Sequence, residues 1–246
     1  MLKICCDRFV ATAVEAVIFD KDGTLADSEQ YLLALGRERS RLLAEGSADI
    51  AALLNDCFGL TTTAVKGGGL LAVGTRHENK IAAVNCLVQA GLAKEQAEQK
   101  VDEAFGVADE LMPEKAASTP VFSGVVPLLQ QLHQIGLSIG ILSSDSTVNV
   151  EAFVQANCLH PYVQACLGTD TALKKPDPAL FHWACQQLGV NAQRAVMVGD
   201  SSTDMIMAKL AGALGSIGVT WGWQIPCLPK EADAIAREFR DIKVLG

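Results

Sequence analysis

Four short segments carry acidic, hydroxyl or lysine side chains that could bind a phosphate group. They are DKDGT (20–24), SSD (143–145), KKPDP (174–178) and GDSSTD (199–204). A hydroxyl group at the end of a strand can bind a phosphoryl oxygen, and the amides at a helix N-terminus attract anions. The lysines at 174–175 precede an expected helix, where the helix dipole disfavours a cation. A phosphate group held by a lysine and the helix amides would resolve that conflict.

Each segment also has a simpler structural interpretation. Asp22-Gly23 is a common turn pair. Ser143 and Asp200 could each cap the helix that follows. Taken one at a time, these segments are therefore ordinary turn and cap sequences, and only their combination suggests a site.

The segments must be positioned by the elements around them, and apolar runs predict buried strands just before three of the four. The predicted strands cover 14–19, 137–142, 163–167, 194–198 and 216–219. Amphipathic helices are predicted over 125–134, 178–188 and 203–211, and a glycine follows each within two residues. Alternating strands and helices predict a Rossmann-like, three-layer α/β core with a parallel sheet. Ligands bind such sheets beyond the carboxyl ends of the strands.

Residues 27–118 have a different pattern. Apolar residues recur there at helical spacing, and no convincing strand is found. We therefore expect an all-helical domain at 27–118, inserted into a discontinuous α/β core domain made of 1–26 and 119–246.

Composition narrows the possible partners and location. The 246 residues carry a net charge of −8 without a long basic run, which disfavours nucleic acid. The uncharged stretch 210–229 holds four glycines and two prolines, so no membrane span is expected. Charged residues in 1–10 argue against a secretory leader. Most of the eight cysteines lie in apolar segments, which indicates free thiols and a cytoplasmic protein.

In this order, the four segments resemble the motifs of the haloacid dehalogenase superfamily, and specifically its phosphatase branch. The family pattern is Asp-x-Asp-Gly-Thr, a strand ending in Ser or Thr, Lys-Pro-x-Pro, and Gly-Asp-x-x-x-Asp. The resemblance covers nearly all of 14–219, and members similar to phosphoglycolate phosphatase and β-phosphoglucomutase carry a helical cap after the first motif. The inserted helices are thus expected to form a cap domain.

The resemblance implies a role for each acidic residue. Asp20 would be the nucleophile that forms an aspartyl-phosphate. Asp22 would protonate the leaving oxygen and then activate water. Asp20, Asp200 and the backbone carbonyl of Asp22 would hold Mg²⁺. Asp204 would support the metal through water or orient the motif lysine, and Thr24 would support the nucleophile loop.

The resemblance also implies which residues hold the transferred phosphoryl group. Ser143 and Lys175 would bind its oxygens and stabilise the transition state. Ser144, which stands where the family often has asparagine, would be a further phosphate-binding residue, and Lys174 is the alternative to Lys175. Lys21 is unusual, because an apolar residue is more common between the two aspartates.

These features predict a magnesium-dependent phosphatase that hydrolyses a small phosphorylated metabolite. Dehalogenases lack the equivalent of Asp22, and phosphonate-cleaving relatives also differ there and need a cap lysine such as Lys66, Lys80 or Lys94. A sugar-phosphate mutase would use the same Asp20 and Asp22 chemistry and stays open as an alternative. A non-catalytic binding protein on the same fold is a further alternative, although the motif residues are all present.

Overall fold

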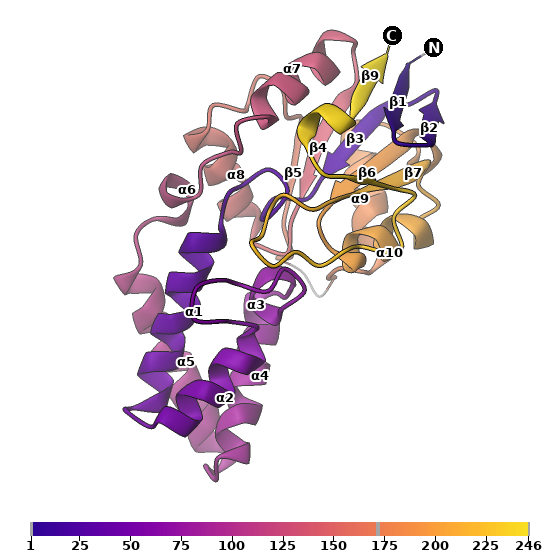
Figure 1. The fold of residues 1–246 in the computed structure, drawn as a ribbon. Helices are drawn as coiled ribbons and strands as arrows, with labels where there is room; N and C mark the ends of the chain where they lie inside the picture. Colours follow the sequence, from indigo (N-terminus) through magenta and orange to yellow (C-terminus); the bar gives the residue numbers. More distant parts are fainter. Residues whose placement is uncertain (1, 171–172, 246) are drawn as a thin grey trace.

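The computed structural model describes residues 2–170 and 173–245, and a six-stranded sheet forms its centre (Figure 1). The strand order is β5-β4-β3-β6-β7-β8, and every neighbouring pair is parallel. The strands are β3 (Ala16–Phe19), β4 (Ser138–Leu142), β5 (Ala165–Leu167), β6 (Ala195–Gly199), β7 (Gly215–Val219) and β8 (Ala234–Ala236). The five predicted strands are all present.

Helices cover both faces of this sheet, because successive side chains of each strand point to opposite sides. Val17 and Phe19 of β3 pack in one cluster with α7 (Val125–Gln134) and α8 (Thr147–Ala156). Ala16 and Ile18 pack in another cluster, with α9 (Pro178–Leu188) and α10 (Ser202–Leu210). The predicted three-layer α/β core is therefore confirmed.

A second, three-stranded sheet was not predicted. It consists of β1 (Lys3–Cys6), β2 (Phe9–Thr12) and β9 (Lys243–Leu245), in the antiparallel order β2-β1-β9. It brings the two ends of the chain side by side, as Figure 1 shows. These strands have three or four residues, too few for a clear alternating pattern, and the pairing of β1 with β9 joins residues more than 200 positions apart.

Residues 27–118 contain six helices and, besides them, only isolated β-bridges. The helices are α1 (Glu29–Ala44), α2 (Ala48–Phe58), α3 (Leu70–Val73), α4 (Arg76–Gln89), α5 (Lys94–Leu111) and α6 (Lys115–Ser118). Side chains from α1 to α5 share one hydrophobic cluster, whereas α6 packs against α8. In Figure 1 the long helices extend away from the carboxyl end of the sheet. The helical character agrees with the prediction, and the domain boundaries at 26/27 and 118/119 stay a prediction.

Two properties expected from composition can be compared with the structure. The eight cysteines are free thiols. Among the described residues, no helix has both the length and the apolar character needed to cross a membrane.

Candidate active site

Polar residues follow three adjacent strands at one edge of the parallel sheet. Asp20 follows β3, Ser143 follows β4 and Asp200 follows β6, and β3 lies between the other two strands. Because the strands are parallel, their carboxyl ends meet at this edge. The three side chains are buried, with Asp20 only 7% exposed. The sheet therefore gathers residues from three of the four predicted segments.

Three carboxylates form a compact buried cluster at this edge. Each of Asp20, Asp200 and Asp204 offers an oxygen, and these oxygens lie within 4.8 Å of one another. The ammonium group of Lys175 lies 2.5 Å from Asp20 Oδ1 and 2.7 Å from Asp204 Oδ1. Three carboxyl groups thus face one ammonium group in a buried site.

Burial, more than the neighbouring negative charge, raises the pKa values of two of these carboxyl groups. Burial raises the pKa of Asp20 to about 6; Lys175 opposes that rise, and Asp204 adds to it. Burial and the charges of Asp20 and Asp204 also raise the pKa of Asp200 well above its usual range. A divalent cation would relieve the repulsion, and buried carboxylate oxygens are the ligands that Mg²⁺ prefers. The donor set fits the predicted metal.

Two donors orient Asp200. Thr24 Oγ1 donates to Oδ1 over 3.2 Å, and the indole Nε1 of Trp223 donates to Oδ2 over 2.6 Å. Trp223 also packs into the hydrophobic cluster of the helical region, so it links that region to the acidic cluster. Sequence reasoning missed Trp223, because it lies in the loop after β7, outside every motif.

Asp204 contacts Lys175 directly, one of the two arrangements predicted for it. Its other oxygen accepts hydrogen bonds from the hydroxyl and the backbone N–H of Ser201, in a capping box at the start of α10. Lys174 lies elsewhere: it pairs with Glu78 of α4 and is 56% exposed. Of the two neighbouring lysines, only Lys175 therefore enters the acidic cluster.

Asp22 lies in a separate ionic network. Its Oδ2 is 2.8 Å from the ammonium of Lys21 and 3.0 Å from that of Lys115. Both lysines also contact Asp145 Oδ2, at 3.3 Å and 2.7 Å. Burial favours a higher pKa for Asp22, but Lys115 and Lys21 outweigh it and hold this pKa below its usual value. The unusual residue type of Lys21 was a signal of this network, whereas nothing in the sequence indicated Lys115.

The two serines after β4 have different surroundings. Ser143 is 2% exposed, and its Oγ accepts a hydrogen bond from the backbone N–H of Asp145. The hydroxyl of Ser144 donates to the carbonyl of Val73 in α3, which belongs to the helical region. Ser143 is therefore placed on the sheet edge beside Asp20, while Ser144 joins the core to the helices. Their phosphate-binding roles remain predictions.

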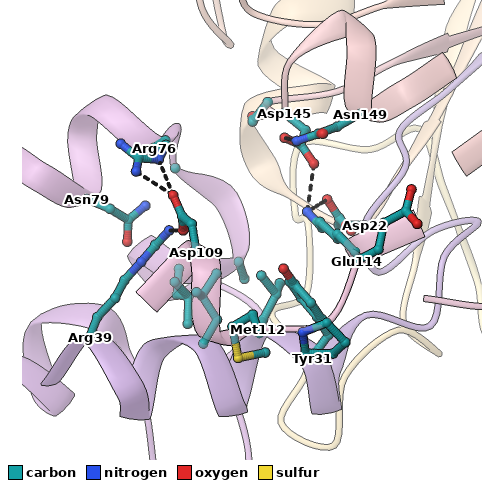
Figure 2. Close-up of a pocket in the computed structure, with 18 residues that line it drawn as sticks. Asp22, Tyr31, Arg39, Arg76, Asn79, Asp109, Met112, Glu114, Asp145 and Asn149 are labelled. Atoms are coloured by element: carbon teal, nitrogen blue, oxygen red, sulfur yellow. Dashed lines mark hydrogen bonds and ion pairs between the residues drawn. The ribbon is translucent and has the colours of Figure 1, made fainter. Parts of the chain in front are cut away.

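A cavity of about 380 Å³ begins at Asp22 and extends between the core and the helices (Figure 2). At its far end, Arg39 and Arg76 both bind the carboxylate of Asp109. The Arg39 guanidinium is almost fully buried and stacks on Phe105, 4.1 Å from the ring centre. Two cations and one anion leave an excess of positive charge at this end.

Comparisons with known proteins agree with this geometry. Residues 14–212 match the family described as haloacid dehalogenase-like hydrolase. The chain is 33% identical to "Probable phosphatase IndB" of Dickeya dadantii, over 84% of this chain and 81% of that protein. It is also 33% identical to a phosphoglycolate phosphatase of Rhodospirillum rubrum, over 80% and 76% of the two chains.

Solved structures show the same fold. A crystal structure described as a predicted phosphoglycolate phosphatase from Haemophilus somnus superposes with a TM-score of 0.68. It is 22% identical, and the match covers 94% of this chain and 96% of that chain. The family match spans most of the sequence, and it includes all four segments that meet at the sheet edge. The chain belongs to the haloacid dehalogenase-like hydrolases.

Proposed function

We propose that this hydrolase is a magnesium-dependent phosphatase that cleaves a small phosphate monoester through an aspartyl-phosphate on Asp20. The observation that carries the proposal is the buried cluster of Asp20, Asp200 and Asp204 around Lys175. A carboxylate nucleophile needs a nearby cation to approach an anionic phosphate, and this cluster offers both an ammonium group and ligands for a metal. The phosphatases among the similar proteins support the same reaction.

The metal would be held by Asp20, Asp200 and the backbone carbonyl of Asp22. When bound, Mg²⁺ supplies positive charge that lowers the repulsion between the nucleophile and the phosphate. Thr24 and Trp223 fix the orientation of Asp200 for this purpose. Asp204 holds Lys175 in place through their ion pair.

The phosphoryl oxygens would be bound by Lys175 and the Ser143 hydroxyl, with Ser144 as a further donor. Asp20 attacks phosphorus, and Asp22 gives a proton to the leaving oxygen as the ester bond breaks. Asp22 then takes a proton from the water that hydrolyses the aspartyl-phosphate. Preorganised donors aimed at the phosphoryl group stabilise the charge of the transition state.

The leaving group would occupy the cavity that begins at Asp22. Its small volume suits a small metabolite, and its far end, with Arg39 and Arg76, suits a negatively charged leaving group. Phosphoglycolate, the substrate named for several similar proteins, has such a group and is our first candidate. We also propose a cytoplasmic location, consistent with the free thiols.

The test is phosphate release from a panel of small phosphate esters with Mg²⁺, with Asp20→Asn run in parallel. We expect release by the wild type alone, with the fold of the variant unchanged by circular dichroism. Asp27→Asn is a matched control, since Asp27 lies near the motif but outside the acidic cluster. Release by Asp20→Asn at the wild-type rate would overturn the proposal. A wild type that transfers phosphate between sugars without releasing it would instead be a mutase.

A further inference from the structure

The helical end of the cavity contains two buried polar atoms that have no hydrogen-bond partner among the described residues. Arg39 Nε is a donor, and Asn79 Oδ1 is an acceptor. Both residues line the cavity, and Figure 2 shows them at the same end, away from Asp22. Buried polar atoms are almost always hydrogen-bonded, because an unpaired one destabilises the protein unless a ligand binds it. The two atoms therefore point to a ligand that both donates and accepts hydrogen bonds at this end.

The amide of Asn79 has only one orientation that suits its neighbours. Its Nδ2 donates to the backbone carbonyls of Thr75 and Leu70, over 2.9 and 3.3 Å. Exchanging the amide oxygen and nitrogen would set the oxygen against two carbonyl oxygens, so these contacts fix Oδ1 as the unpaired atom. Asn79 lies near the start of α4 and is 2% exposed. The helix thus holds a hydrogen-bond acceptor at the wall of the cavity.

The charges nearby decide which kind of donor can pair with Asn79. A hydroxyl or an ammonium group of a substrate could donate to Oδ1, whereas a carboxylate can only accept. Arg39 and Arg76 leave this end with an excess of positive charge, which repels an ammonium group. The donor that fits is therefore a hydroxyl, and an anionic group attracted by the arginines can accept from Arg39 Nε.

We infer that Asn79 is a specificity-determining residue whose Oδ1 accepts a hydrogen bond from a hydroxyl of the leaving group. The substrate class is then a phosphate monoester of a dihydroxy acid, which keeps one hydroxyl and its carboxylate when the other hydroxyl is esterified. Glycolate, the leaving group of phosphoglycolate, has a carboxylate but no second hydroxyl, so it would leave Asn79 Oδ1 unpaired. This inference rests on the proposed function and narrows its substrate.

The test compares three esters that differ at one carbon atom. At C2, 3-phosphoglycerate carries a hydroxyl, 3-phosphooxypropionate carries hydrogen and O-phosphoserine carries an ammonium group. We expect kcat/KM of the wild type to be roughly 10- to 100-fold higher for 3-phosphoglycerate than for either of the other two, the effect of leaving a buried polar atom unpaired. Phosphate release with Mg²⁺ is the measurement.

Asn79→Ala tests whether Asn79 is the source of that preference. The variant should lower kcat/KM for 3-phosphoglycerate about tenfold, the effect of one lost hydrogen bond, and change that for 3-phosphooxypropionate about threefold or less. Loss of the structural contacts of the Asn79 amide alone would lower both values equally, so the ratio of the two separates recognition from structure. Asn85→Ala is the matched control, because Asn85 is an exposed asparagine on the same helix, and it should leave both values unchanged.

The outcomes distinguish this inference from the proposed function. A wild type that hydrolyses esters without preferring 3-phosphoglycerate among the three, or an Asn79→Ala variant that keeps the preference, would overturn the role of Asn79 and leave the phosphatase proposal intact. If Asn79→Ala does not fold, the comparison of the three esters with the wild type still decides the inference. A wild type that releases phosphate from no ester at all would overturn both proposals.

Discussion

The sheet edge and the helical end of the cavity are built in different ways. At the sheet edge, Asp20 and Asp200 follow strand ends, and Lys175 reaches them from the loop before α9, in a cluster dominated by carboxylates. At the helical end, Arg39 and Arg76 come from two helices and surround one carboxylate, so positive charge is in excess. A substrate that spans the cavity would meet cation-binding chemistry at one end and anion-binding chemistry at the other.

The two ends would have different roles: residues at the sheet edge carry out the reaction, and residues at the helical end recognise the leaving group. Asp20, Ser143 and Asp200 directly follow β3, β4 and β6, so the sheet sets their positions. The cationic end depends on how α1, α4 and α5 pack, and its residues lie up to 70 positions apart in the sequence. Changes at the sheet edge should therefore reduce turnover of every ester, whereas changes at the helical end should depend on the substrate.

Metal removal should have the largest effect and should act at the sheet edge. Treatment with a chelator is expected to lower turnover about 10³-fold, since a bound metal contributes several kcal/mol of charge stabilisation. Added Mg²⁺ should restore turnover and raise the melting temperature of the wild type but not of Asp200→Asn. Full activity in metal-free buffer would contradict the metal assignment.

Lys175→Ala should have the second-largest effect on turnover. It removes the only described ammonium group within the acidic cluster, and turnover should fall roughly 10²- to 10³-fold, as for other lost transition-state donors. Lys174→Ala is the matched control, because Lys174 forms an exposed ion pair, and its effect should be about threefold or less. Equal effects of the two changes in steady-state kinetics would show that the lysines have been assigned in the wrong order.

Arg39→Gln tests whether the helical end of the cavity recognises the leaving group. For an ester whose leaving group carries a carboxylate, KM is expected to rise about tenfold, the value of one lost charged hydrogen bond. For a neutral leaving group the change should be small. Arg41→Gln, on the same helix but exposed and paired with Glu38, should alter neither KM. A uniform effect of Arg39→Gln on all esters would place Arg39 outside the recognition site.

Asp145→Asn should lower the stability of the fold, and its effect on stability should be more direct than its effect on catalysis. Burial favours a higher pKa for Asp145, but Lys115 and Lys21 lower it below the usual value of about 3.8. Because the folded-state pKa is the lower one, this carboxylate stabilises the fold above pH 4 and loses that contribution as the pH falls below it. Thermal unfolding should show Asp145→Asn about 2 kcal/mol less stable than the wild type at pH 7. Below pH 4 the stability of the variant should fall less steeply with pH than that of the wild type. Parallel curves for the two proteins would contradict this.

Local patterns made much of this architecture predictable. The apolar runs that precede Asp20, Ser143 and Asp200 form buried strands within about two residues of the predicted bounds. A strand that is buried on both faces needs apolar residues at successive positions, so it shows as a continuous apolar run in the sequence. Helical spacing likewise predicted the helices of 27–118. Three of the four motif segments meet because parallel strands place their carboxyl ends together. The segment of Lys175 reaches them from the loop before α9.

Other contacts were not predictable because they depend on long-range packing. Trp223 reaches Asp200 from a loop without a motif, and Lys115 reaches Asp22 from 93 positions away. The pairing of β1 with β9 also joins distant, short strands that have little local pattern. Each of these contacts depends on how distant parts of the chain pack together, so residues that are adjacent in the sequence do not predict it.

The most direct test of the central claim is to trap the phosphorylated enzyme during turnover. Borohydride reduces an aspartyl-phosphate to homoserine, and mass spectrometry of the digested protein identifies the residue that was modified. The account predicts modification at Asp20 alone, only when both substrate and Mg²⁺ are present. An unmodified Asp20 in an enzyme that is turning over, or modification at another carboxylate, would contradict it.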